Sequence, residues 1–511
     1  MRVSFIYLGV IWAIAMIILV GCGPAELVLT ATPEPVAQAG VEDWDDREVF
    51  RVGLVAAEHK TLDELPGASV YHIDVRLMDD YSGLEGQERV RYTNQENVPL
   101  DSLYFQLFPN MEGGKTRLTK VMIAGQALEP IYEDTGSTVR LPLGRLLAPG
   151  EQVVVQMDFL VDVPDKPGGS YGLFGYMGEI LALDGFYPAI PVYDEHGWHK
   201  GQIPANSDTT FQDASFYVVR VTAPAALVLV ASGVEVEKTR KDNQQVVTFA
   251  AGPARDFYMA GSERFVVMSA MAGETKVNSY AFKVFDDGSR LALRTAVNAL
   301  KSYTERLGAY PYSEFDVVST PIRGASGIEY PGMTGINFTY YNLETTVGAG
   351  GLPTAVMLEG TIAHEVGHQW FYNLVGNDQM NEPWVDEALT QYLTGLYYLD
   401  EYGPQGWDGY RASWEARWNG VQRALIPIGL PAASYSGNEY GGIVYGRGPL
   451  FVEALAQKLG PDSFKQFLRD YTRTHRWGIS STADFKDAAE VECRCDLDGL
   501  FDEWVVRAGA E

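Results

Sequence analysis

Positive charge is scarce in this sequence. The 511 residues include 39 lysines and arginines against 67 aspartates and glutamates, so the formal net charge is −28. Contacts to phosphate need a basic surface, so this balance argues against non-specific nucleic-acid binding, and we expect no nucleic-acid partner. An acidic cleft would instead suit the cationic N-terminus of a peptide.

Cysteine is also scarce, with three residues in the whole chain. Cys493 and Cys495 stand in VECRCDLDG without further metal ligands nearby, which argues against a zinc knuckle. They could form a strained disulfide across a very short loop, or remain two free thiols. Neither interpretation gives them a function.

A long apolar run opens the chain at residues 3–20, directly after Arg2. A charged residue, an apolar stretch and small residues before a cut are features of a secretory signal. Because Cys22 follows a glycine, residues 1–21 resemble a bacterial lipoprotein signal, which implies lipidation of Cys22. An uncleaved anchor helix is the alternative, since the run is nearly long enough to span a bilayer. Both interpretations predict an extracytoplasmic protein held at a bacterial cell membrane.

The chain is too long for one typical core, so several domains are expected. Residues 22–66 should form a tether and lead-in segment, because they begin rich in Pro, Ala and Thr. Residues 67–267 hold β-branched, partly alternating runs such as YHIDVRL and ASFYVVRVTAP, which predict an antiparallel β-sandwich or saddle-shaped sheet. Helical periodicity dominates residues 268–511. The predicted fold class is α+β, with this β domain followed by a mainly helical domain.

Within the second region, apolar periodicity predicts helices at residues 291–308, 352–376 and 382–403. It also predicts at least two helices within residues 449–475. The second helix should end at Gly376, while Pro383 and Gly403 suit the start and the end of the third. A strand, FDVVSTPI, should lie between the first two helices.

The second predicted helix carries the sequence HEVGH. His364 and His368 are four residues apart and therefore lie on one helix face. Neutral imidazoles at this spacing can both reach one zinc ion at about 2.0–2.1 Å. Glu365 lies off that face, where it can reach a water at the metal and act as general base. An ordinary helix with two histidines by chance is the alternative.

A catalytic zinc site needs three protein ligands and one open position. Glu387 follows His368 after eighteen intervening residues, in the first turn of the next predicted helix, so its carboxylate can return to the histidines. Asp386 is the nearest rival ligand, but it should point about 100° away and is better placed to orient a neighbour. We therefore predict one Zn²⁺ per chain.

HEVGH, followed after eighteen residues by Glu387 in WVDEA, resembles the gluzincin metallopeptidases of the aminopeptidase N family. The resemblance extends from about Tyr71 to Val506, and it implies a thermolysin-like zinc peptidase domain over residues 268–511. SGIEY resembles the family's exopeptidase loop, which implies that Glu329 binds the free α-amine of the substrate. IVYGRGPLFVEAL resembles the segment with the catalytic tyrosine, which implies that role for Tyr445.

These roles also make chemical sense for the residues themselves. A carboxylate such as Glu329 in an apolar, glycine-rich loop is costly unless it meets a cation, although a solvated turn glutamate is the alternative. Gly324 and Gly327 would let a substrate backbone approach closely. A phenol such as Tyr445 can donate to a developing oxyanion, an interaction worth about 10²–10³ in rate. Tyr440, five residues earlier, is its rival.

The sequence also departs from the family pattern. Tyr330 replaces an asparagine, and Ala388 replaces the usual glycine after the third ligand. No polar amine-binding residue is evident in the β domain, where Asp184 is a weak candidate. His196 and His199, in DEHGWHK, are expected in a surface loop near the cleft rather than at a second metal. By the same resemblance, we expect the large helical C-terminal domain of many relatives to be missing, which would give longer substrates easier access.

Together these features predict a zinc metallo-aminopeptidase that hydrolyses N-terminal residues from peptides, lipid-anchored and monomeric. A thermolysin-type endopeptidase is one alternative. The other is a non-catalytic, zinc-containing peptide-binding lipoprotein, although a purely structural site would not need the base Glu365. Activity on free and N-acetylated peptides separates these three hypotheses.

Overall fold

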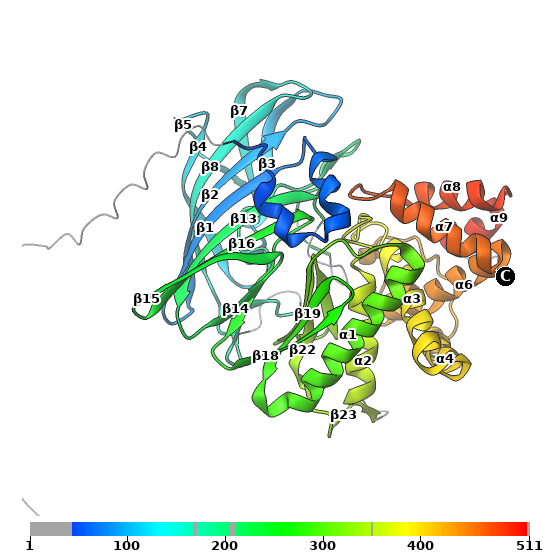
Figure 1. Cartoon of the computed structure of the whole chain (residues 1–511). Helices are drawn as coiled ribbons and strands as arrows, with labels where there is room; N and C mark the ends of the chain where they lie inside the picture. The colour runs from blue at the N-terminus through cyan, green and yellow to red at the C-terminus, as the bar shows by residue number, and fades with distance from the viewer. Residues whose placement is uncertain (1–42, 167–170, 202, 205–210, 349–350, 508–511) are drawn as a thin grey trace, which may run out of the picture. The chain divides into compact units, whose positions relative to one another are not determined.

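The computed structural model describes residues 43–166, 171–201, 203–204, 211–348 and 351–507 (Figure 1). The predicted signal, Cys22 and the tether up to residue 42 lie outside the described residues. Within the described part of the chain, no helix is both long enough and apolar enough to cross a membrane.

The N-terminal part of the described chain is built from β-sheets, as predicted. Figure 1 shows the strands of the largest sheet in the order β15 (Val234–Lys241), β16 (Gln244–Ala254), β13 (Ser215–Pro224), β1 (Val70–Leu77), β2 (Gly83–Thr93), β8 (Gln152–Asp162), β4 (Lys115–Ile123) and β5 (Gln126–Ala127). A smaller sheet has the strand order β3 (Leu100–Gln106), β7 (Thr138–Leu147) and β6 (Ile131–Glu133). Another has the order β14 (Val228–Ala231), β17 (Met259–Ser262), β10 (Ile180–Leu183) and β9 (Phe174–Met177).

Alternation of apolar and polar residues explains these strands. In β8, every second side chain from Val153 to Val161 is buried, and they pack into the core of the β domain. One detail differs from the expected antiparallel arrangement, because β1 and β13 pair in parallel. The two strands are far apart in the sequence, and a parallel pair needs such a long connection.

A mixed sheet and a set of helices form the second part. Its sheet has the order β18 (Phe265–Ala272), β19 (Thr275–Phe282), β20 (Glu314–Thr320), β22 (Met333–Asn337) and β21 (Gly327–Tyr330). The longer helices are α1 (Asp286–Leu307), α2 (Thr354–Gly367), α3 (Trp384–Tyr402), α4 (Pro404–Gly420), α6 (Gly448–Leu459), α7 (Pro461–Thr474) and α8 (Thr482–Cys493). The expected α+β class is confirmed. The expected boundary between residues 267 and 268 falls within β18, so the exact division stays a prediction.

The predicted helix 352–376 is wrong at its C-terminal end, because α2 stops at Gly367. The chain then turns, and Tyr372 adopts a positive φ of 117°. Arg255 stabilises this turn, since its Nε–H donates to the carbonyls of Tyr372 and Asn373 and its side chain is buried between the two parts of the fold. Gly376 instead pairs with Ile479 in an isolated bridge.

Helix α3 confirms the predicted third helix and fixes the position of its first turn. Pro383 is its N-cap residue and Gly403, with φ 69°, follows its end. The ring of Trp384 is fully buried against the rings of Phe451, Phe485 and Phe501. These aromatic contacts fix the position of the first turn of α3, which carries Glu387.

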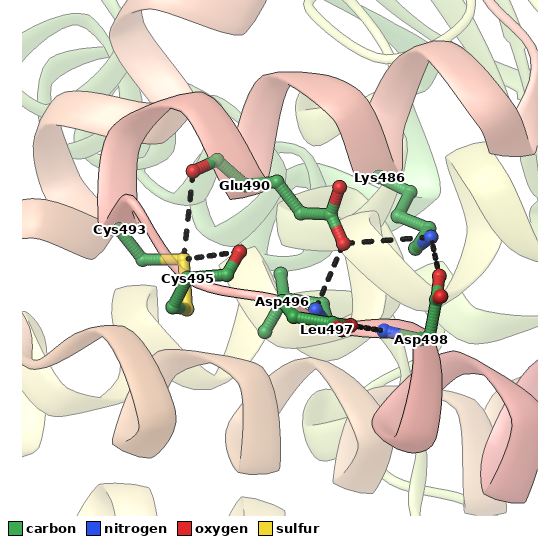
Figure 2. Close-up of a disulfide and its surroundings, with 7 residues drawn as sticks. All are labelled: Lys486, Glu490, Cys493, Cys495, Asp496, Leu497 and Asp498. Carbon is green, nitrogen blue, oxygen red and sulfur yellow. Dashed lines mark hydrogen bonds and ion pairs between the residues drawn. A yellow bond between two sulfur atoms is a disulfide. The ribbon is translucent and has the colours of Figure 1, made fainter.

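Cys493 and Cys495 form a disulfide with an S–S distance of 2.14 Å, at the end of α8 (Figure 2). The neighbouring carboxylate of Glu490 accepts a hydrogen bond from the backbone N–H of Leu497 at 2.8 Å and lies 3.4 Å from the ammonium of Lys486. Because the sulfurs of Cys493 and Cys495 are bonded to each other, the free-thiol alternative does not hold in the structure.

Candidate metal centre

Three buried side chains meet where α2 ends and α3 begins. The Nε2 atoms of His364 and His368 lie 3.2 Å apart, and Oε2 of Glu387 lies 3.1 Å and 3.5 Å from them. Ligands at about 2.0–2.1 Å from a tetrahedral ion are separated by about 3.3 Å, so the three spacings suit one zinc ion. No other kind of donor is needed to complete a three-ligand catalytic site.

The surroundings of the two imidazoles also fit metal binding. Nδ1 of His368 lies 3.0 Å from the carbonyl oxygen of Phe371, so an Nδ1–H donates there and Nε2 keeps its lone pair. Burial lowers the pKa of His364 to about 4, which leaves the neutral ring that zinc requires. Burial alone would raise the pKa of Glu387, but the neighbouring imidazoles of His364 and His368 hold it well below its usual range. Glu387 is therefore an anionic ligand.

A second trio of possible ligand atoms shares His368 with Glu329 and Asp386. Gln379 already occupies this second group, because its Nε2 donates to Oε1 of Glu329 at 2.8 Å and to Oδ2 of Asp386 at 2.9 Å. Asp386 also accepts from Asn377 at 3.1 Å. These contacts agree with the prediction that Asp386 orients its neighbours, and they favour the trio with Glu387 for the metal.

Glu365 lies beside the trio on α2 and is only 4% exposed. Burial raises the pKa of its carboxyl well above its ordinary value, and the carboxylates of Glu329 and Glu387 add to that rise. A carboxylate with a raised pKa is a better match for proton transfer near neutral pH. Gly327 gives it room, because a Cβ there would lie 2.5 Å from Oε1 of Glu365 and 2.7 Å from Thr361.

Tyr445 comes from η8 (Ile443–Arg447), a single π-helical turn between α5 (Glu439–Gly442) and α6. Its hydroxyl donates to Oε1 of Glu387, and its ring lies 5.9 Å from that of His364. Single π-turns are frequent at functional sites, because they re-aim one side chain within a helix. The rival Tyr440 stacks edge-on against Tyr445 at 5.7 Å, so both line the same space.

Glu329 and Gly327 lie on β21, the edge strand of the mixed sheet. Glu329 is 5% exposed, and an oxygen of its carboxylate lies within 4.8 Å of a ring nitrogen of His368. Burial raises the pKa of this carboxyl. An edge strand presents unpaired backbone groups that an extended peptide can join as an added strand. Gly324, with φ 87°, occupies the left-handed region that favours glycine in the preceding loop.

All these side chains open into one cavity of about 820 Å³. This volume is within the range usual for small-ligand sites. The cavity is lined by Gly324, Gly327, Glu329, His364, Glu365, His368, Glu387 and Tyr445, and from the β domain by Tyr171 and Leu173. The structure thus brings together every site residue predicted for metal, base, oxyanion donor and amine binding, while their roles stay predictions.

Two supporting residues were missed by the sequence analysis. Gln379 bridges Glu329 and Asp386, and the polar run NDQMNE between the two helices was its available signal. Nε2 of Gln391 lies 3.4 Å from Nδ1 of His364, and its Oε1 accepts from Arg417 at 3.2 Å. Gln391 is four residues after Glu387, so the i, i+4 rule would have placed both on one face.

The weaker candidates lie elsewhere. Asp184 is buried near Tyr258 and Tyr330, whose pKa values it helps to raise, and it is not among the residues that line the cavity. His199 directly follows β12 (Gly197–Trp198), which pairs with β11 (Tyr193–Asp194), and its Nε2 lies 2.5 Å from Oδ2 of Asp194. Among the described residues, neither His196 nor His199 joins a group of three possible metal ligands.

Comparisons with known proteins agree with this geometry. Residues 291–504 match the peptidase family M1 domain. Over 460 residues the chain is 22% identical to Aminopeptidase 2 of Candida albicans, a match that covers 86% of this chain and 47% of that protein. It is 23% identical over 290 residues to Tricorn protease-interacting factor F2 of Thermoplasma volcanium. That match covers 54% of this chain and 36% of that protein. The chain thus spans less than half the length of these two relatives.

Among solved structures, the fold is similar to an M1 zinc metallopeptidase from Deinococcus radiodurans, with a TM-score of 0.65 and 19% identity. That likeness covers 87% of this chain and 94% of the other. It includes the β part as well as the helical part. Residues 291–504 thus match the M1 peptidase domain, and the two-part fold is similar to that of an M1 zinc metallopeptidase.

Proposed function

We propose that this chain is a zinc-dependent aminopeptidase that removes N-terminal residues from peptides. The observation that carries the proposal is the buried carboxylate of Glu329, which lies within 4.8 Å of the ligand His368 and at the end of an edge strand. A buried carboxylate is costly without a cation, and the α-ammonium of a peptide supplies one. An ammonium held there leaves room for a single residue before the scissile bond.

His364, His368 and Glu387 would hold the zinc ion, which supplies Lewis acidity to polarise a carbonyl and to acidify water. Glu365 would take the proton of the attacking water and pass it to the leaving amine, since it directly follows His364 on α2 and lines the same cavity as the trio. Tyr445 would donate its phenolic hydrogen to the oxygen of the tetrahedral intermediate. Its present acceptor, Glu387, places the hydroxyl beside the metal ligands.

The backbone of β21 would hold the substrate in an extended conformation. A glycine is needed at position 327, because the Cβ of any other residue there would displace the carboxylate of Glu365. Gly324 would keep the preceding loop clear of the peptide. The similarity to M1 peptidases supports these roles, and the buried Glu329 argues against an endopeptidase, whose substrate would bring no charge to this point.

The direct test compares hydrolysis of aminoacyl amides and short peptides, free and N-acetylated, by the zinc-loaded full chain. We expect cleavage of free substrates and a loss of at least about 10²-fold on acetylation, because the acetylated nitrogen cannot pair with Glu329. Equal cleavage of both forms would indicate the endopeptidase instead. Zinc binding without cleavage of either form would indicate the non-catalytic binding protein.

We also propose that the protein is a monomer anchored outside the cytoplasm by a lipid on Cys22. The support is the sequence of residues 1–22, which lie outside the described residues. Metabolic labelling with an alkyne fatty acid in a bacterial host should tag the wild-type chain and leave Cys22→Ser untagged. Labelling of both forms would exclude Cys22 as the lipid site.

A further inference from the structure

The cavity continues well past the zinc ligands along α2. Residues that line it recur along the helix from His368 through Glu365 and Thr361 to Val356. With a rise of 1.5 Å per residue, these positions cover about 18 Å. A single amino-acid residue and its scissile bond fill only part of such a length.

The direction of the peptide follows from the proposed function, on which this inference rests. Glu329 lies beside His368, so the α-ammonium binds at the C-terminal end of α2. The scissile bond then lies near Glu365. The residue that follows it must extend towards Thr361 and Val356, at the N-terminal end of the helix.

A carboxylate and several tyrosines line that far end. Oε1 of Glu359 accepts hydrogen bonds from the hydroxyls of Tyr397, at 2.9 Å, and Tyr402, at 2.5 Å. Its second oxygen has no hydrogen bond or ion pair among the described residues. Burial and the contact with Glu359 raise the pKa of Tyr402 to about 12, so this phenol stays a hydrogen-bond donor to that carboxylate.

Aromatic faces and glycines shape the space around this carboxylate. The ring of Tyr398 stacks on Tyr410 at 4.8 Å and on Tyr402 at 5.8 Å, and all three line the cavity. Gly360 lets Tyr398 pack closely on α2, because a Cβ there would lie 3.3 Å from the hydroxyl of Tyr398. At Gly409, on the α4 wall, a Cβ would meet nothing within 4 Å.

The charges near this end are mostly negative. Glu401 adds to the rise in the pKa of Tyr402, whereas Arg294 opposes it but forms no ion pair with Glu359. Of the described residues that line the cavity, Arg417 alone carries a guanidinium. It lies about three helical turns along α4 from Gly406, a neighbour of Tyr398, and donates to Gln391 near His364.

We propose that this pocket, formed by Glu359, Tyr398, Tyr402 and Tyr410, binds the side chain of a lysine or arginine that follows the scissile bond. The stem of such a side chain packs along Gly360, and its cation meets the free oxygen of Glu359 and the tyrosine faces. The protein is then selective for peptides with a basic second residue.

The test compares kcat/KM for Ala-Lys and Ala-Arg with kcat/KM for Ala-Gln and Ala-Leu, using the zinc-loaded full chain. The expected ratio of Ala-Lys to Ala-Gln is at least about tenfold. In Glu359→Gln, which keeps the size and an acceptor oxygen for the tyrosines, this ratio should fall to about one. Glu401→Gln is the matched control, because its exposed carboxylate binds Asn298 and does not line the cavity. It should keep the wild-type ratio.

A ratio near one in the wild type, with both dipeptides hydrolysed, overturns the pocket and leaves the aminopeptidase standing. If no dipeptide is hydrolysed, the proposed function fails, and the pocket is judged by calorimetric binding of the same dipeptides. Tighter binding of Ala-Lys than of Ala-Gln, lost in Glu359→Gln, supports the pocket even then. Equal binding overturns it.

Discussion

Replacing Glu365 with glutamine is expected to lower kcat on an aminoacyl amide by about 10²–10⁴ while zinc stays bound. Glutamine has nearly the same shape, so it still fits beside Gly327, where a Cβ would already lie 2.5 Å from Oε1 of Glu365. What it lacks is a carboxylate that can accept the proton of the attacking water. The effect should therefore fall on kcat, with little change in KM, because Glu365 is not the group that binds the α-amine.

Steady-state kinetics and metal analysis of the same purified sample provide the measurement. The matched control is Glu382→Gln, in the turn before α3, whose carboxylate accepts from the backbone N–H of Thr482 at 3.2 Å and does not line the cavity. It should keep kcat and zinc content. If Glu365→Gln retained more than about a tenth of the wild-type kcat, or lost its zinc, Glu365 could not be assigned as the general base.

Much of this site was predictable because its chemistry follows local spacing. His364 and His368 face one way through helix geometry alone, and the structure places their Nε2 atoms 3.2 Å apart. Glu387 could be placed in a first turn because Pro383 and the polar run before it mark the start of a helix. These inferences needed only the order of neighbouring residues.

Other parts depend on contacts between distant segments and were beyond such reasoning. The early end of α2 is linked to Arg255, more than a hundred residues away, which binds the carbonyls of Tyr372 and Asn373. The parallel pairing of β1 with β13 likewise joins strands separated by most of the β domain. Periodicity predicts that a segment is helix or strand, but the partner is selected by packing across the whole chain.

The predicted roles of Glu329 and Tyr445 could be inferred only in part from the residues themselves. Their residue types suggested amine binding and oxyanion stabilisation, yet the resemblance to a family was needed to select them from the many glutamates and the 29 tyrosines of the chain. The structure supplies the missing observation for each: burial beside His368 for Glu329, and a π-turn that directs Tyr445 to Glu387. Both observations are tertiary.

Replacing Glu387 with glutamine is expected to abolish stable zinc binding, and with it nearly all peptidase activity. A neutral amide is a poor zinc ligand, and two imidazoles alone do not complete the three-ligand site. A ligand that binds only the folded state at about 1,000 times its Kd stabilises a protein by about 4 kcal/mol. Chelation should therefore lower the Tm of the wild type, whereas Glu387→Gln should begin at the lower Tm and show little further change.

Asp386→Asn is the decisive comparison, because Asp386 belongs to the rival trio with Glu329 and His368. We expect this variant to keep its zinc and its chelator-dependent shift in Tm. The oxygens of Asp386 already accept from Asn377 and Gln379 and are not needed by the metal. The reverse pattern, with zinc lost in Asp386→Asn and kept in Glu387→Gln, would move the metal to the rival trio. Glu329 would then be a ligand and could no longer be assigned to the α-amine of the substrate.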